Sequence, residues 1–106
     1  MITHVLEKVK IYSSIVGKIK GLIGESEPAE TGSGIALPGV NSVHTFFVGY
    51  PIDLVFLNSD NKIIRTAEKQ RRFSFSPIVW KAKTTLELKQ GSVSKLKLKV
   101  GDKVEF

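Results

Sequence analysis

The sequence predicts a small α+β fold, in which mostly antiparallel β-strands form a barrel or a sandwich with one N-terminal helix and a short C-terminal helical turn. Three observations predict this class. Residues 52–57 form a nearly continuous apolar run between a proline and an Asn-Ser-Asp-Asn turn, which is typical of a strand covered on both faces. Apolar residues within 15–23 recur at helical spacing and end at a glycine. Several other segments alternate between apolar and charged residues, as half-buried strands do.

The remaining elements follow from the same periodicities. Residues 58–61 are turn formers and predict a hairpin to a partner strand at 62–68. Residues 96–100 alternate as a strand does, whereas Gly91-Ser92-Val93-Ser94 offers a helix start. The other predicted strands cover residues 5–12, 42–48, 82–88 and 104–106, and residues 35–37 form a short apolar run that ends at a Pro-Gly turn.

A length of 106 residues predicts a single domain over residues 1–106. Residues 24–34 combine Gly, Ser, Pro and Thr with three glutamates and have no apolar periodicity, so they are expected to form a mobile acidic loop. The chain has no cysteine, which excludes disulfides and thiolate chemistry. It also lacks an apolar run of membrane-spanning length and a signal-peptide pattern, so a cytoplasmic protein without a membrane span is expected.

Positive charge is concentrated in the second half of the chain. The net charge is +6, with −2 over residues 1–60 and +8 over residues 61–106. Residues 71–75, Arg-Arg-Phe-Ser-Phe, interleave basic and aromatic side chains, which can contact phosphates and stack on bases. The alternative is that the aromatic rings fill the core and the basic side chains are solvated. If the chain binds nucleic acid, the candidate residues are Arg71, Arg72, Lys81 and Lys83.

His44 and Asp53 are the candidate polar pair for a small-molecule or enzymatic site, with Thr45 beside them. A histidine and a carboxylate within hydrogen-bond distance can act as a general base. The alternative is structural, because a buried Asp53 would satisfy polar groups without catalysis. No second histidine or cysteine lies near this pair, and no Gly-x-Ser-x-Gly or phosphate-binding glycine loop is present. We therefore expect no catalytic residues, no metal and no cofactor.

Three blocks of residues resemble one known family. They are Gly21-Leu22-Ile23-Gly24, then residues 42–57 with Ser-Val-His-Thr-Phe-Phe and Pro-Ile-Asp-Leu-Val-Phe-Leu, and residues 86–104 with Leu-Glu-Leu-Lys-Gln-Gly and Val-Gly-Asp-Lys-Val. The chain is similar in these blocks to the uncharacterised prokaryotic family called domain of unknown function 192. The resemblance implies a compact β-rich fold with one or two helices and no established activity. It also favours a helical turn over residues 92–97.

The sequence therefore assigns no specific function, and a non-enzymatic role is expected. The leading hypothesis is a small accessory domain that binds an unknown protein partner, because the core is complete and no catalytic set is visible. The two alternatives are nucleic-acid binding through the basic second half, and a small-molecule or enzymatic site around His44 and Asp53.

Overall fold

The computed structural model describes residues 1–12, 27–39, 50–70 and 79–106. Within these ranges the chain forms short strands and one helix of five residues. In chain order they are β1 (Thr3–Val5), β2 (Val9–Ile11), β3 (Gly34–Pro38), β4 (Ile52–Leu57), β5 (Ile63–Gln70), β6 (Thr84–Lys89), α2 (Ser92–Leu96) and β7 (Lys103–Glu105).

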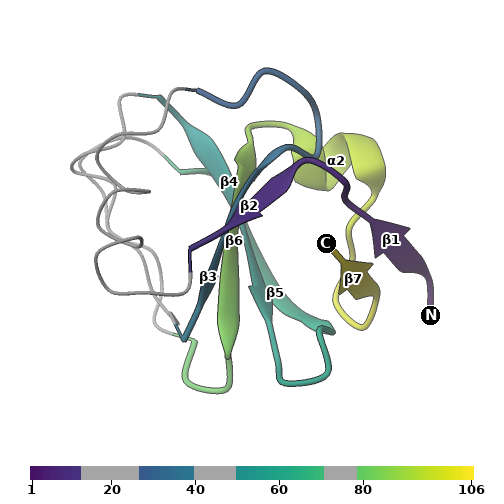
Figure 1. Cartoon of the computed structure of the whole chain (residues 1–106). Helices are drawn as coiled ribbons and strands as arrows, with labels where there is room; N and C mark the ends of the chain where they lie inside the picture. Colours follow the sequence, from purple (N-terminus) through teal and green to yellow (C-terminus); the bar gives the residue numbers. More distant parts are fainter. Residues whose placement is uncertain (13–26, 40–49, 71–78) are drawn as a thin grey trace.

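Strand β6 is the central strand of a five-stranded sheet with the order β2-β3-β6-β4-β5 (Figure 1). It pairs antiparallel with β3 on one side and with β4 on the other, and β4 pairs antiparallel with β5. Strand β2 joins the sheet parallel to β3. Strands β1 and β7 form a separate parallel pair, which lies with α2 beside the larger sheet.

The predicted α+β class and the predicted closed barrel are both wrong. The described residues are mostly β, and α2 has five residues. Barrel closure requires the two edge strands to complete a ladder. Here β2 contributes three residues and β5 is irregularly registered against β4, and the two do not pair within the described ranges. The helix expected within residues 13–24 and the strand expected at 42–48 lie outside the described residues. The single domain over residues 1–106 stays a prediction.

Three predicted elements are confirmed by their local structure. All six residues of β4 are buried, as expected for a strand covered on both faces. The hairpin that joins β4 to β5 is closed by Asn58, whose Oδ1 accepts hydrogen bonds from the N–H groups of Asp60 (2.9 Å) and Lys62 (3.0 Å). The helical turn that the family resemblance favoured near residues 92–97 corresponds to α2.

The strand predicted over residues 5–12 is divided into β1 and β2, which belong to different sheets. Leu6 lies between them, is buried, and donates its N–H to the carbonyl oxygen of Glu105 (2.7 Å). A continuous strand would have extended one ladder only. The break allows β1 to pair with β7 and β2 to pair with β3.

The two faces of the large sheet contact different apolar clusters. One face packs against α2 and the β1–β7 pair through residues that include Leu86, Leu88, Val93 and Val104. The other face carries a cluster of buried and half-buried apolar residues: Ile35, Leu37, Ile52, Leu54, Phe56 and Ala82, with Tyr12, Tyr50, Ile64, Ala67 and Val79. Because side chains alternate along each strand, Glu87 on β6 belongs to this second face.

Gly34 brings β3 close to β6 and is expected to tolerate no side chain. A Cβ atom at Gly34 would collide with the backbone carbonyl of Glu87, whereas a Cβ at Gly101 would have no atom within 4 Å. We expect Gly34→Ala to lower the free energy of unfolding by about 3 kcal/mol or more, through overpacking. Gly101→Ala should lose only about 1 kcal/mol, from its positive φ of 96°. Urea denaturation of both variants measures this, and equal losses would contradict the close approach.

Candidate functional site

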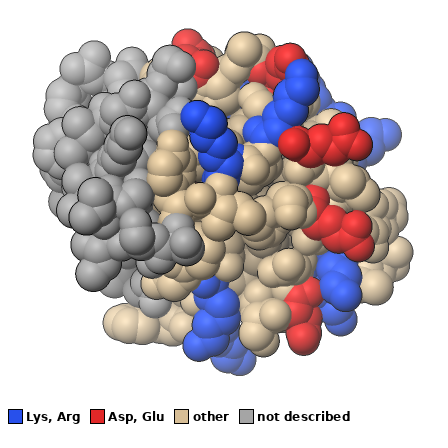
Figure 2. Space-filling model, in the orientation of Figure 1, with Lys and Arg blue, Asp and Glu red and all other residues tan. Residues whose placement is uncertain are grey.

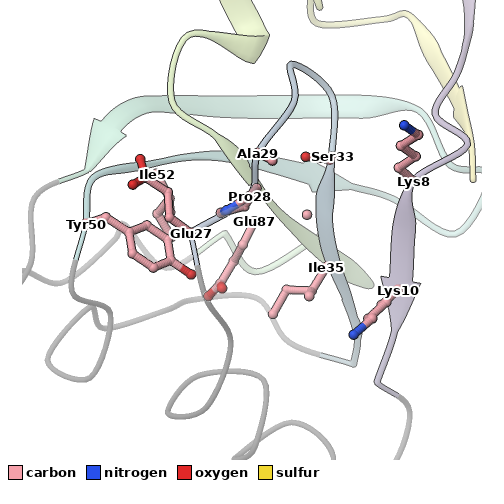
Figure 3. A pocket seen from close by; sticks show the side chains of 11 residues that line it. Lys8, Lys10, Glu27, Pro28, Ala29, Ser33, Ile35, Tyr50, Ile52 and Glu87 are labelled. Atoms are coloured by element: carbon pink, nitrogen blue, oxygen red, sulfur yellow. The ribbon is translucent and has the colours of Figure 1, made fainter.

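A cavity of about 250 Å³ lies on the second face of the sheet (Figure 3). Its walls come from β2 and the residue before it, from β3 and the segment before it, from the start of β4 and from the middle of β6. The lining residues are Lys8, Lys10, Glu27, Pro28, Ala29, Ser33, Gly34, Ile35, Tyr50, Ile52 and Glu87. The walls thus combine apolar side chains with a few charged ones, which is the composition of small-molecule sites.

Glu87 occupies the cavity from the central strand. In the ladders it pairs with Ile35 of β3 and with Leu54 of β4, so backbone surrounds it on both sides. The residue is 5% exposed, and its Oε1 atom is buried without a hydrogen-bond partner among the described residues. Burial raises the pKa of the Glu87 carboxyl from 4.5 to about 7. A buried acceptor without a partner is costly unless something binds it.

Lys10 lies in the same cross-strand row as Glu87. Lys10 of β2 pairs with Ile35 of β3, and Ile35 pairs with Glu87 of β6. Residues that are directly opposite in a sheet project from the same face. The row therefore carries a lysine, an isoleucine and a glutamate in order, and Figure 3 shows Lys10 and Glu87 with Ile35 between them.

Residues 27–34 form one rim of the cavity and are attached to three neighbouring elements. Lys8 Nζ donates to both carboxylate oxygens of Glu30, at 2.6 and 2.7 Å. The N–H of Gly32 donates to Ser92 Oγ (2.9 Å), and the N–H of Lys89 donates to the carbonyl oxygen of Ser33 (3.0 Å). These contacts hold the described part of the segment that was expected to be mobile, and its mobility stays a prediction.

Asp53 is a fully buried brace on the opposite face of the sheet. Its Oδ2 accepts the N–H of Val93 at the start of α2, and its Oδ1 accepts the N–H of Lys69, each at 2.9 Å. Lys69 has a φ of 51° and lies where the β4–β5 register shifts, which removes its N–H from the ladder. Both carboxylate oxygens thus accept backbone N–H groups. This arrangement fits the alternative in which a buried Asp53 satisfies polar groups without catalysis. The assignment of Asp53 to a ligand site stays a prediction.

The other predicted site residues divide into two groups. His44, Thr45, Arg71 and Arg72 lie outside the described residues. Lys81 and Lys83 are exposed beside the start of β6. On the face of the molecule in Figure 2, lysine and arginine side chains are interspersed with aspartate and glutamate. The described part of that face therefore carries no continuous basic surface of the kind that nucleic-acid binding uses.

A second titratable pair connects the N-terminal strand to β7. His4 Nε2 lies 2.9 Å from Asp102 Oδ2, and the N–H of Ile2 donates to Asp102 Oδ1 (3.3 Å). The hydrogen bond with His4 is the main cause that lowers the pKa of Asp102 below its ordinary value. The pair joins residues 98 positions apart in the sequence, and neither residue lines the cavity.

Within the four described ranges, no group of three or more histidine, cysteine, aspartate or glutamate residues could hold a metal ion. In the same part of the chain, no helix is long and apolar enough to cross a membrane.

The sequence predicted a strand over residues 82–88 and did not identify Glu87 as a site residue. Alternation with a period of two predicts that apolar side chains face the core and polar side chains face solvent. The available signal was in the neighbouring strand, because β4 is apolar at nearly every position and therefore predicts a sheet that is covered on both faces. A glutamate in the middle of the adjacent strand would then be buried too.

Replacement of Asp53 should destabilise the protein. Asp53→Ala leaves two N–H groups without an acceptor, at about 1–3 kcal/mol each, so we expect a loss of about 3 kcal/mol. Asp53→Asn keeps one carbonyl oxygen and should lose about half as much. Chemical denaturation measures both, with Asp60→Ala in the exposed hairpin turn as the control. An Asp53→Ala variant as stable as that control would contradict the bracing role.

Ionisation of Glu87 should destabilise the fold as the pH rises. The folded protein keeps the proton up to about pH 7, whereas the unfolded chain releases it near 4.5, so stability declines across this window. The full difference amounts to about 3 kcal/mol. Glu87→Gln removes this dependence and should therefore gain stability over the wild type at pH 8 but not at pH 4. Urea denaturation at both pH values tests this against exposed Glu105→Gln, and parallel pH profiles for the wild type and Glu87→Gln would refute it.

Two solved structures share the fold. One is the crystal structure of a protein of unknown function from Novosphingobium aromaticivorans, with a TM-score of 0.79 and 21% identity, over 92% of this chain and 74% of that chain. The other is a putative transcription regulator from Sinorhizobium meliloti, with a TM-score of 0.72 and 22% identity, over 88% of this chain and 76% of that chain. At these identities the likeness shows the fold alone.

No curated protein matches the chain in sequence. The model of one protein family, DUF192, described as an uncharacterized ACR, matches residues 3–106. This range covers nearly the whole sequence and includes the Leu-Glu-Leu segment that carries Glu87. The expected resemblance is thereby confirmed: the chain belongs to the DUF192 family, whose function is unknown.

Proposed function

We propose that this protein binds a small organic molecule in the cavity around Glu87. The observation that carries the proposal is Glu87, which lines the cavity and whose buried Oε1 atom has no hydrogen-bond partner among the described residues. A ligand that donates a hydrogen bond to this atom would recover the free energy lost by desolvation.

The cavity supports a small occupant. Its volume of about 250 Å³ is slightly below the range of about 300–1,000 Å³ for drug-sized ligands. Ile35 and Ile52 supply apolar walls, and Tyr50 supplies an aromatic one. A few polar groups on apolar walls fix the orientation of a ligand, as they do in small-molecule sites generally.

The proposed site differs from the one expected around His44 and Asp53, because Asp53 lies on the other face of the sheet with both carboxylate oxygens bonded to backbone. A non-enzymatic role beside a protein partner is compatible with ligand binding and stays a prediction. Nucleic-acid binding and a cytoplasmic location stay predictions as well. No contact among the described residues supports nucleic-acid binding or a cytoplasmic location.

The test uses small polar fragments and two-dimensional amide NMR spectra of the full chain. We expect some fragments to shift the resonances of cavity residues such as Ser33, Ile35 and Glu87 in the wild type. Ala29→Trp should abolish these shifts, because Ala29 is exposed at the rim and an indole there fills the cavity without disturbing the core.

The matched control is Thr31→Trp, which adds the same side chain two residues away at an exposed position that does not line this cavity. It should retain the wild-type shifts. The proposal is wrong if no fragment perturbs the cavity resonances, or if Ala29→Trp folds and still shows the same shifts.

A further inference from the structure

The buried carboxyl of Glu87 lacks a hydrogen-bond donor at one of its oxygens. The side chain is 5% exposed and lines the cavity, and its Oε1 atom has no hydrogen-bond partner among the described residues. We infer that the ligand is a primary amine with a short apolar tail, whose ammonium group donates a hydrogen bond to the Glu87 carboxylate. This inference rests on the proposed function and adds the chemical class of the ligand.

The positive charge of the ligand follows from the surroundings of Glu87. Desolvation is the cause that raises the pKa of its carboxyl to about 7, and no cationic side chain in the described part of the chain offsets this. A neutral donor would satisfy the oxygen and leave the buried charge without a counterion. An ammonium group supplies the N–H and the charge together, and hydrogen bonds between ionised groups are about twice as strong as neutral ones.

The charged side chains around the cavity also favour one additional positive charge. Lys8, Lys10, Glu27 and Glu87 line it, and Lys8 is paired with Glu30. When Glu87 is ionised, these two lysines and three glutamates carry a net negative charge. Lys10 has an interaction of its own, so neither lysine is assigned to the ligand. A ligand with a single positive charge balances the set.

The apolar tail follows from the walls next to Glu87. Ile35 is its partner across the β3–β6 ladder, and Ile52 lies at the start of β4; both are buried and belong to the cluster against which Tyr50 packs. Figure 3 shows Ile35, Ile52 and Tyr50 around Glu87. An alkyl tail on these walls gains about fourfold in affinity for each methylene that it buries. The aromatic ring adds attraction for a cation that lies over its face.

The experiment compares four probes on the full chain at pH 8, by NMR titration of the cavity resonances: butylamine, butyltrimethylammonium, butanol and methylamine. We expect butylamine to bind best. Butyltrimethylammonium keeps the charge and the tail without an N–H donor, and butanol keeps the tail and a donor without the charge, so each should bind about tenfold more weakly or worse. Methylamine lacks the tail and should also lose about tenfold or more.

The affinity for butylamine should rise about tenfold from pH 6 to pH 8. The ammonium group pairs with ionised Glu87, whose pKa of about 7 leaves most of the free protein protonated at pH 6. Butanol should show no such gain. The other titratable side chains that line the cavity are Lys8, Lys10, Glu27 and Tyr50. Glu87→Gln keeps all four and should lose the pH dependence, which separates their contribution from that of Glu87.

Three further comparisons assign the contact and locate it. At pH 8, Glu87→Gln should weaken butylamine by about tenfold and leave butanol unchanged. Glu105→Gln, an exposed glutamate on β7 that does not line the cavity, is the matched control and should change neither value. Ala29→Trp should abolish the binding of every probe, whereas Thr31→Trp should retain it.

The outcomes separate this inference from the proposed function. Butanol or butyltrimethylammonium binding as tightly as butylamine would overturn the primary amine and leave a ligand site in place. The same holds if butylamine affinity is flat with pH, if Glu87→Gln binds butylamine as the wild type does, or if other fragments bind and none of the four probes does. If no compound perturbs the cavity resonances, the proposed function itself fails and the inference falls with it.

Discussion

The burial of both faces of strand β6 is the constraint on which the rest of this structure depends. The strand is paired on each side, with Leu86 and Leu88 inside one apolar cluster and with Glu87 beside the other. A side chain on this strand therefore has no direct route to solvent except through a cavity. The cavity of about 250 Å³ lies where the glutamate projects. The fold thus places one ionisable group where water is largely excluded and leaves space in front of it.

Asp53 and Glu87 are both buried carboxylates in this sheet, but their surroundings differ. Asp53 accepts two backbone N–H groups, so both of its carboxylate oxygens have hydrogen-bond partners within the fold. Glu87 has an oxygen without such a partner among the described residues, and desolvation raises its pKa to about 7. Buried carboxylates with complete hydrogen bonding are parts of the structure, whereas those without it are candidates for binding. The comparison within one sheet favours a bracing role for the first residue and supports the second as the proposed ligand contact.

The sequence predicted the strands well where one local rule applied. The apolar run of β4, the Asn58 turn and the start of α2 all carry local signals, and all are present. The closed barrel was wrong because closure depends on whether β2 and β5 meet, and no local pattern encodes the pairing of edges. The site was harder still. Asp53 was noticed for its residue type, but the ligand proposal now rests on Glu87, whose burial depends on strand pairing and on cover from residues 27–34.

A carboxyl at position 87 is a poor choice for stability alone. A leucine there would continue the apolar pattern of the second face, beside Ile35 and Leu54. Such conflicts between local stability and residue choice concentrate at functional sites, because a group that lacks partners in the free protein is available to a ligand. The rim beside Glu87 is attached to its neighbours by the Lys8–Glu30 ion pair and by backbone hydrogen bonds. A rim that packed against Glu87 would fill the space that a ligand needs. The polar contacts hold the rim in place and leave the cavity beside Glu87 open.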